Sequence, residues 1–192
     1  MLELVLGSTS PFRRELLEKL GLPFSTAAPN VDETRDADET PQQLVLRLAE
    51  AKARAVAPQH PKALIIGSDQ VACVDEQILG KPGSREKAIQ QLCAMSGKTV
   101  IFHTGLCLYN SQADRAQVAC ESYRVHFRAL DSGQIARYVD KEQPYNCAGS
   151  FKSEGLGITL FRRLEGDDPN TLVGLPLIRL VEMLDREAVV LP

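Results

Sequence analysis

The sequence lacks the marks of a nucleic-acid-binding protein, a membrane protein and a secreted protein. Its formal net charge of −3 argues against a surface that wraps DNA or RNA, because neutralisation of phosphates dominates such binding. The chain has no basic start and no long apolar segment, so neither a signal peptide nor a membrane span is expected. We therefore expect no nucleic-acid polymer and no membrane among its partners.

Cysteine and histidine are too few and too scattered to suggest a disulfide framework or a metal cluster. The five cysteines are odd in number, widely spaced and without any C-x-x-C pair, a pattern typical of reduced thiols in the cytosol. The three histidines are also far apart in the sequence, so no histidine-based metal site is visible. These absences predict a cytoplasmic protein.

The chain does have the composition of an ordinary globular protein, with 44% hydrophobic and 24% charged residues. Its 192 residues suffice for one domain, or one domain with two lobes, and for a substantial core. No internal repeat or linker interrupts it. The net charge of −3 still allows a small anionic ligand to be held by a few local cations.

The most informative stretch is residues 64–71, which read L-I-I-G-S-D-Q-V. Its apolar start predicts a strand that is buried on both faces. The strand is expected to end at Asp69, and in α/β proteins ligands sit at the carboxyl ends of strands. Burying that carboxylate without a partner would be costly, which favours a functional role. The alternative is that Asp69 is an ordinary turn residue or helix cap.

A strand at residues 2–6 is followed by a loop of small residues and a helix from Pro11 to about residue 20, with Ser10 as its N-cap. Free N–H groups and the positive end of a helix dipole form an anion-binding arrangement, although this loop lacks the Walker pattern. Arg13 and Arg14 lie in the first turn, where the dipole disfavours cations. They are either a solvated pair or a clamp on an anion.

Three further charged residues are candidates for a site. A capping box at Thr40 begins a second helix, whose apolar stripe surrounds Lys52. The Lys52 ammonium either extends to solvent or points at a buried anion. In the acidic loop before this helix, which is mostly expected at the surface, Glu33 is the carboxylate most able to turn inward. Lys81 follows a predicted hairpin return on a stiff loop and is expected near Asp69.

The remaining pattern predicts short strands, three helices and a long hairpin. The two hairpin strands alternate as half-buried strands do, which suggests an extended, strongly twisted sheet. Residues 147–160 are rich in glycine and permit close approach of a ligand. The expected elements are strands at 24–28, 99–108 and 116–127, a hairpin return at 74–79, helices at 84–95, 131–141 and 175–184, and a polar loop at 165–170.

Seven separated pieces of the chain can be read together: residues 8–14 (S-T-S-P-F-R-R), 31–33 (V-D-E), Lys52, 67–71 (G-S-D-Q-V), 80–82 (G-K-P), 148–151 (A-G-S-F) and 173–176 (V-G-L-P). Together, and in this order, they closely resemble the Maf family of nucleoside triphosphate pyrophosphatases. The resemblance implies an α/β, inosine-triphosphatase-like fold. It would form a single domain over residues 1–192, with a mixed, strongly twisted sheet and two lobes around a central cleft.

The resemblance also implies a reaction and the residues that perform it. The cleft would take a nucleoside triphosphate with a divalent cation, Mg²⁺ or Mn²⁺, and release a nucleoside monophosphate and pyrophosphate. Glu33 and Asp69 would hold the metal together with phosphate oxygens, and Asp69 would accept a proton from the attacking water. A homodimer is a further implication. The phosphates would be held by four side chains, Ser8, Arg13, Lys52 and Lys81.

Three positions separate this chain from the branch of that family that cleaves dTTP and UTP. That branch has arginine, threonine and glutamine where this chain has Phe12, Gln70 and Glu154, and these departures resemble the branch that cleaves 7-methyl-GTP. The chemistry agrees, because a carboxylate such as Glu154 can accept both N–H donors on guanine's Watson–Crick edge. Methylation makes guanine cationic, which favours that carboxylate and the aromatic face of Phe12.

The sequence therefore predicts a metal-dependent pyrophosphatase that acts on 7-methyl-GTP and clears modified nucleotides. The alternative within the enzyme class is dTTP, UTP or another noncanonical triphosphate. The alternative from another class is a nucleotide-binding regulator, for instance of cell division, with little turnover. Glu33 and Asp69 favour the enzyme, because a pure binder gains little from two carboxylates that face a polyanion without a catalytic metal.

Overall fold

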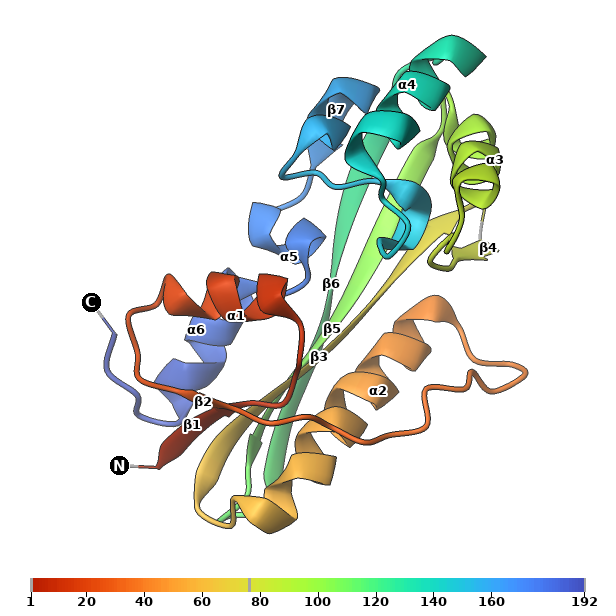
Figure 1. The fold of residues 1–192 in the computed structure, drawn as a ribbon. Coiled ribbons are helices and arrows are strands. Elements are labelled where there is room, and N and C mark those ends of the chain that lie inside the picture. The colour runs from red at the N-terminus through yellow and green to blue at the C-terminus, as the bar shows by residue number, and fades with distance from the viewer. Residues whose placement is uncertain (1, 76, 192) are drawn as a thin grey trace. The chain divides into compact units, whose positions relative to one another are not determined.

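The computed structural model describes residues 2–75 and 77–191 and is drawn in Figure 1. Contacts between residues divide the chain into two compact units. The first unit comprises Met1–Gln70, His103–Glu121 and Asp168–Pro192, and the second comprises Val71–Phe102 and Ser122–Asp167. The single domain with two lobes around a central cleft, expected from the resemblance, stays a prediction.

Parallel strands form the base of the first unit. Strand β1 (Glu3–Leu6) lies between β2 (Ser25–Thr26) and β3 (Ala63–Val74) and is parallel to both. The hairpin ends of β5 (Thr99–Asn110) and β6 (Arg115–Phe127) extend this part of the sheet in the order β2-β1-β3-β5-β6. Antiparallel pairs elsewhere make the whole sheet mixed, as expected for this α/β chain.

Helices cover both faces of the first unit's sheet. One cluster of buried side chains joins β1, β3 and β5 to α1 (Pro11–Glu18) and α6 (Leu177–Arg186). A second cluster joins the alternate residues of the same strands to α2 (Pro41–Val56), which Figure 1 shows on the opposite side of β3. From residue 102 to its end β5 is therefore buried at every position. The expected half-buried alternation is wrong there, because both faces are covered.

Helix starts in this unit follow from local sequence. Ser10 accepts a hydrogen bond from the Arg13 N–H and caps α1, as expected, although α1 ends at Glu18, earlier than residue 20. The capping box at Thr40 is present at the start of α2, with Gln43 as its reciprocal partner. A short helix, α5 (Pro169–Val173), precedes α6 and was not expected.

Two glycines let α2 lie unusually close to the sheet. A β-carbon on Gly67 would lie 2.0 Å from the Ala49 carbonyl oxygen, and one on Gly105 would lie 2.0 Å from the Val45 carbonyl oxygen. Any side chain at either position would push the helix away. Lys52 lies one turn along α2 from Ala49, so this close approach brings its side chain over β3.

Strand β3 does not end where the sequence suggested. Asp69 lies within the strand, which continues to Val74 and pairs antiparallel with β4 (Gln77–Leu79). The prediction that Asp69 ends the strand is therefore wrong, because later residues of β3 gain a new neighbour. The parallel strand β1 does stop, with Leu6 opposite Ile66. Asp69 thus lies three residues beyond the end of its parallel neighbour.

The second unit combines the remaining parts of β3, β5 and β6 with β4, a further strand and two α-helices. Four phenylalanines pack edge to face in its core, with ring centroids 5.0–5.4 Å apart. The expected polar loop after residue 164 instead contains the end of a strand, β7 (Phe161–Glu165). The helices of the second unit are α3 (Arg85–Met95) and α4 (Ser132–Glu142), and its 3₁₀ turns are η2 (Ala148–Ser150) and η3 (Leu156–Leu160). The first unit has the 3₁₀ turn η1 (Ala57–Gln59) after α2.

The sequences of β7 and α5 explain why neither element was expected. Strand β7 carries mostly exposed, polar residues, so it shows no hydrophobic period, and it is formed by antiparallel pairing with β6. Helix α5 has only five residues, fewer than two turns of apolar pattern. Across residues 2–75 and 77–191, every helix is too short or too polar to cross a lipid bilayer.

Candidate active site

Lys52 lies at the centre of a buried cluster of charges in the first unit. Its Nζ donates to Asp69 Oδ1 at 2.7 Å and lies 2.7 Å from Glu33 Oε1. Lys52 and Asp69 are only 7% and 8% exposed, whereas Glu33 comes from an exposed loop. The ammonium therefore points at two carboxylates, of which only Asp69 is buried, and does not extend to solvent. Glu33 turns toward it, as expected of this carboxylate.

Arg13 belongs to the same electrostatic cluster, and Arg14 does not. Burial lowers the pKa of the Arg13 guanidinium, and the charges of Asp69 and Glu33 oppose that shift. Arg14 instead pairs with Glu18 at 3.2 Å on the exposed side of α1. Arg14 is therefore solvated, whereas the binding of an anion by Arg13 stays a prediction.

The carbonyl oxygen of Gly174 ties three segments of this site together. It accepts a hydrogen bond from Arg13 Nε at 2.9 Å and another from Ser68 Oγ at 3.0 Å. Gly174 has a φ of +122°, a conformation that residues with a side chain rarely adopt. Glycine is therefore required here to present this carbonyl to both donors. The role of Ser68 was missed, although it stands directly before Asp69 in the sequence.

Gln70 uses its amide nitrogen to hold α5. Its Nε2 lies 2.9 Å from Thr104 Oγ1, 2.8 Å from the Thr171 carbonyl oxygen and 3.2 Å from the Leu172 carbonyl oxygen. Because an amide nitrogen carries two hydrogens, these acceptors occupy it fully and leave the amide oxygen for a ligand. The selection of a base by Gln70 stays a prediction, and none of its α5 partners was foreseen.

Buried Asp168 is a further supporting residue that the sequence analysis missed. Its side chain accepts hydrogen bonds from the Asn170 N–H at 2.8 Å and from the Ile178 N–H at 2.9 Å. It thereby caps α5 and links it to the first turn of α6. An aspartate directly before Pro169 is the sequence signal for such a cap.

The loop between β1 and α1 is a folded turn that presents Ser8. The Gly7 N–H continues the strand pairing with the Ile66 carbonyl oxygen at 2.8 Å, and Ser8 Oγ accepts from the Ser10 N–H at 3.1 Å. A hydroxyl that accepts one bond still has its own proton to donate, so Ser8 can bind an anion. Phe12, in the first turn of α1, is 38% exposed and leaves an aromatic face accessible.

Lys81 and Glu154 belong to the second unit, and both are exposed. Each acts on the partly buried thiol of Cys147. Burial raises the pKa of that thiol, Lys152 opposes the rise, Glu154 adds to it and Lys81 opposes it. The expected placement of Lys81 near Asp69 and at the phosphates, and of Glu154 at the base, stays a prediction.

The donor set fits a divalent cation that shares its ligands with a substrate. Among the described residues, no group of three or more histidine, cysteine, aspartate or glutamate side chains is arranged to hold a metal. Glu33 and Asp69 do supply two carboxylates within 2.7 Å of one cationic atom. Mg²⁺ is commonly bound by one or two carboxylates together with substrate phosphates, so these two residues suit that arrangement.

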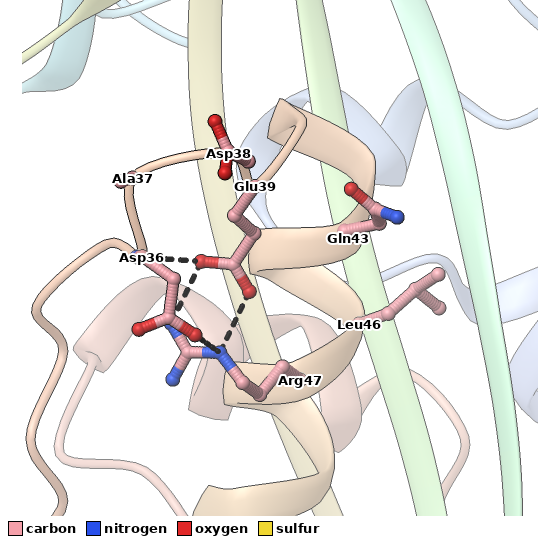
Figure 2. A pocket seen from close by; sticks show the side chains of 7 residues that line it. All are labelled: Asp36, Ala37, Asp38, Glu39, Gln43, Leu46 and Arg47. Carbon is pink, nitrogen blue, oxygen red and sulfur yellow. Dashed lines mark hydrogen bonds and ion pairs between the residues drawn. The ribbon is translucent and has the colours of Figure 1, made fainter.

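A hollow of about 530 Å³ at the acidic loop and the start of α2 is a separate feature of the first unit (Figure 2). Arg47 and Glu39 line this hollow and form an ion pair there, with Arg47 Nε 2.7 Å from Glu39 Oε1 and Arg47 Nη2 2.8 Å from Glu39 Oε2. These bonds hold the pKa of Glu39 below its ordinary value. Glu39 is therefore buried and anchored, contrary to the expectation of a wholly solvated acidic loop, and the hollow contains none of the expected site residues.

Comparison with known proteins identifies the family. Residues 3–187 match the family model described as "Maf-like protein". A "7-methyl-GTP pyrophosphatase" of Alcanivorax borkumensis is 62% identical over 98% of this chain and 96% of its own length. Proteins of the same name from Colwellia psychrerythraea and Pseudomonas aeruginosa are 59% and 57% identical, over 98% and 100% of this chain and 94% and 100% of theirs. The chain belongs to the Maf family, as the resemblance indicated.

Proposed function

We propose that this protein is a nucleoside triphosphate pyrophosphatase that hydrolyses 7-methyl-GTP to 7-methyl-GMP and pyrophosphate, clearing modified nucleotides. The observation that carries the proposal is the 57–62% identity, over nearly the whole chain, to relatives that bear this name. The buried charge cluster of the first unit supports it, because it combines cations for phosphates with two carboxylates for chemistry on a water molecule.

Phosphate binding is assigned to the start of α1 and the cations around it. The positive end of the α1 dipole, the Ser8 hydroxyl and the Arg13 guanidinium suit an anion in one place. Lys52 supplies a second charge from α2. Lys81 is proposed as a further phosphate ligand on the basis of the family resemblance. Cleavage of a phosphoanhydride depends mainly on such positioning and charge stabilisation.

Glu33 and Asp69 are proposed to hold Mg²⁺ or Mn²⁺ together with phosphate oxygens. When bound, such a cation lowers the pKa of a water and neutralises charge on the phosphates. Asp69 then accepts the water proton, at Oδ2, the oxygen other than the one that Lys52 contacts. Lys52 orients this carboxylate by holding Oδ1. An unassisted aspartate has a pKa of about 3.9 and is a weak base, so the two roles of Asp69 are coupled.

Recognition of the base is assigned to Glu154, Phe12 and Gln70. Glu154 accepts the two adjacent N–H donors of guanine, and its charge favours the cationic methylated ring. Phe12 offers an exposed aromatic face to that ring, an attraction of about 0.5–2 kcal/mol. The Gln70 amide oxygen remains available for a polar contact, because its nitrogen is engaged by α5.

The test is pyrophosphate release from a panel of triphosphates. A malachite-green assay with added inorganic pyrophosphatase, run with Mg²⁺ or Mn²⁺, should give the highest kcat/KM for 7-methyl-GTP. A preference for dTTP or UTP would favour the alternative substrates of the sequence analysis. Tight binding of a nucleotide with no release of pyrophosphate would favour the regulator instead.

The proposal includes a cytoplasmic location and leaves room for a homodimer. None of the five cysteines, all of them in the described part of the chain, forms a disulfide, as is usual in a reducing compartment. The dimer is an implication of the family resemblance. Analytical ultracentrifugation of the purified protein would test it, with a single species at the 21.1 kDa chain mass as the contrary outcome.

A further inference from the structure

The two carboxylates proposed to hold the metal already share a cation. Lys52 Nζ lies 2.7 Å from Glu33 Oε1 and 2.7 Å from Asp69 Oδ1. One ammonium thus bridges two segments that are 36 residues apart in the chain. A lysine placed only to bind phosphate would not need to touch both carboxylates.

This bridge lies where electrostatic interactions are strong. The side chains of Lys52 and Asp69 are 9% and 11% exposed, so water screens the pair poorly. Removing either partner of a buried pair leaves an uncompensated charge, which is strongly unfavourable. The ammonium therefore stabilises the two carboxylates in the conformation described by the structure.

A divalent cation would bind the same two carboxylates. Mg²⁺ takes oxygen ligands at about 2.0–2.1 Å with nearly octahedral geometry. The ammonium holds one oxygen of each carboxylate, Glu33 Oε1 and Asp69 Oδ1, and leaves the other oxygen of each to a metal. Two cations on the same pair of carboxylates repel each other at short range, so each weakens the binding of the other.

We infer that Lys52 is the resident counter-ion of this site and competes with the divalent cation for Glu33 and Asp69. Metal entry displaces the ammonium from at least one carboxylate and frees it to bind a phosphate oxygen. Lys52 thereby couples metal loading to substrate binding. The inference rests on the proposed function, since it takes Glu33 and Asp69 as the metal ligands.

Glu33 is the partner that the geometry points to as the one released. Its side chain is 60% exposed on a loop, so it can move and be solvated. Asp69 lies within β3, and α2 is held against that strand by the close contact at Gly67. The Lys52–Asp69 pair therefore persists while the Lys52–Glu33 contact opens.

Manganese affinity of the nucleotide-free protein tests the inference. Free Mn²⁺ is followed by electron paramagnetic resonance as it is titrated into wild type and Lys52→Met. Losing the competing charge should tighten Mn²⁺ binding by roughly tenfold or more. Lys62→Met, which removes an exposed lysine and the same charge, is the matched control and should bind as wild type does. Equal or weaker binding by Lys52→Met would overturn the inference.

Thermal unfolding covers the case in which Lys52→Met is too unstable to titrate. If the cation can replace the ammonium, added Mn²⁺ should raise the Tm of Lys52→Met more than that of wild type, or restore its fold. A variant that stays unfolded at saturating Mn²⁺, or that gains no more than wild type, would contradict the competition.

Failure of this inference differs from failure of the proposed function. Wild type that releases pyrophosphate normally while Lys52→Met gains no Mn²⁺ affinity would remove only the competition. Wild type that releases no pyrophosphate from any triphosphate would remove the enzyme, whatever the Mn²⁺ titration shows.

Discussion

The two units of this chain hold their charged site residues in opposite ways. In the first unit, Lys52 of α2 and Asp69 of β3 are nearly buried and paired at 2.7 Å, where α2 packs closely against the sheet. In the second unit, Lys81 and Glu154 are exposed to solvent. A buried pair is held rigidly, because breaking it leaves a bare charge, whereas exposed charges are screened and mobile. We propose that the buried pair of the first unit is preorganised for chemistry and that the exposed charges of the second unit adapt to the bound nucleotide.

The largest effect should come from Asp69→Asn. The amide cannot accept a proton from the attacking water, so kcat should fall by roughly 10²–10⁴. The fold should change little, because asparagine has the same shape, keeps an oxygen for Lys52 and leaves Glu33 as the counter-charge of that lysine. Pyrophosphate release and circular dichroism would be measured beside Asp185→Asn, which alters an exposed carboxylate of α6. Near-wild-type release from Asp69→Asn would place the chemistry elsewhere.

The rigidity of the first unit should depend on Gly67. In Gly67→Ala the new β-carbon would lie 2.0 Å from the Ala49 carbonyl oxygen, so α2 must shift. We expect the free energy of unfolding in urea to fall by about 1–3 kcal/mol, a typical cost of overpacking. Gly80→Ala is the control, because nothing lies within 4 Å of its β-carbon position. An equal loss in both variants would mean that the close helix contact is not what holds this unit.

A smaller and more selective effect is expected in the second unit. Glu154→Gln replaces two hydrogen-bond acceptors by one acceptor and one donor. The preference for 7-methyl-GTP over dTTP, measured as the ratio of kcat/KM values, should fall by roughly tenfold. Glu86→Gln, an exposed change on α3, should leave the ratio unaltered. An unchanged preference in Glu154→Gln would remove this residue from the base pocket and weaken the division of roles.

The smallest effect concerns the acidic loop of the first unit. Arg47 holds the pKa of Glu39 below its ordinary value. A carboxyl group whose pKa is lowered on folding stabilises the protein above its unfolded pKa of about 4.3, and this stability is lost as the pH falls through the folded value. Urea unfolding at acid pH should therefore show a shallower decline in Arg47→Met. The exposed Arg162→Met serves as control, and identical declines in all three proteins would contradict the assignment.

Short-range signals in this sequence predicted structure well. Ser10 and Thr40 begin their helices because capping depends only on residues three positions away. Asp131 caps α4 and forms a second capping box with Gln134. Two elements were missed: β7 exists through its pairing with β6, and α5 is a five-residue helix whose cap signal at Asp168 was overlooked.

The candidate site was predicted as a set of residues, and their partners were not. Asp69 was expected at a strand end, but β3 continues because β4 pairs with it. The Gly174 carbonyl and the Ser68 hydroxyl gave no sequence signal of their joint role beyond their place in two short motifs. Hydrogen bonds between residues more than a hundred positions apart depend on how the elements pack.

By itself, the sequence determined the α/β class, the buried strand, the helix starts, the family and the charged residues from which a site could be made. Each of these follows from a local pattern or from short motifs read in order along the chain. Only the tertiary structure decided which of those charges meet. Lys52 joins Glu33 and Asp69, and Arg13 is held by the Gly174 carbonyl while Arg14 stays at the surface. The physical reason is that burial and pairing of a charge depend on neighbours that the fold alone brings together.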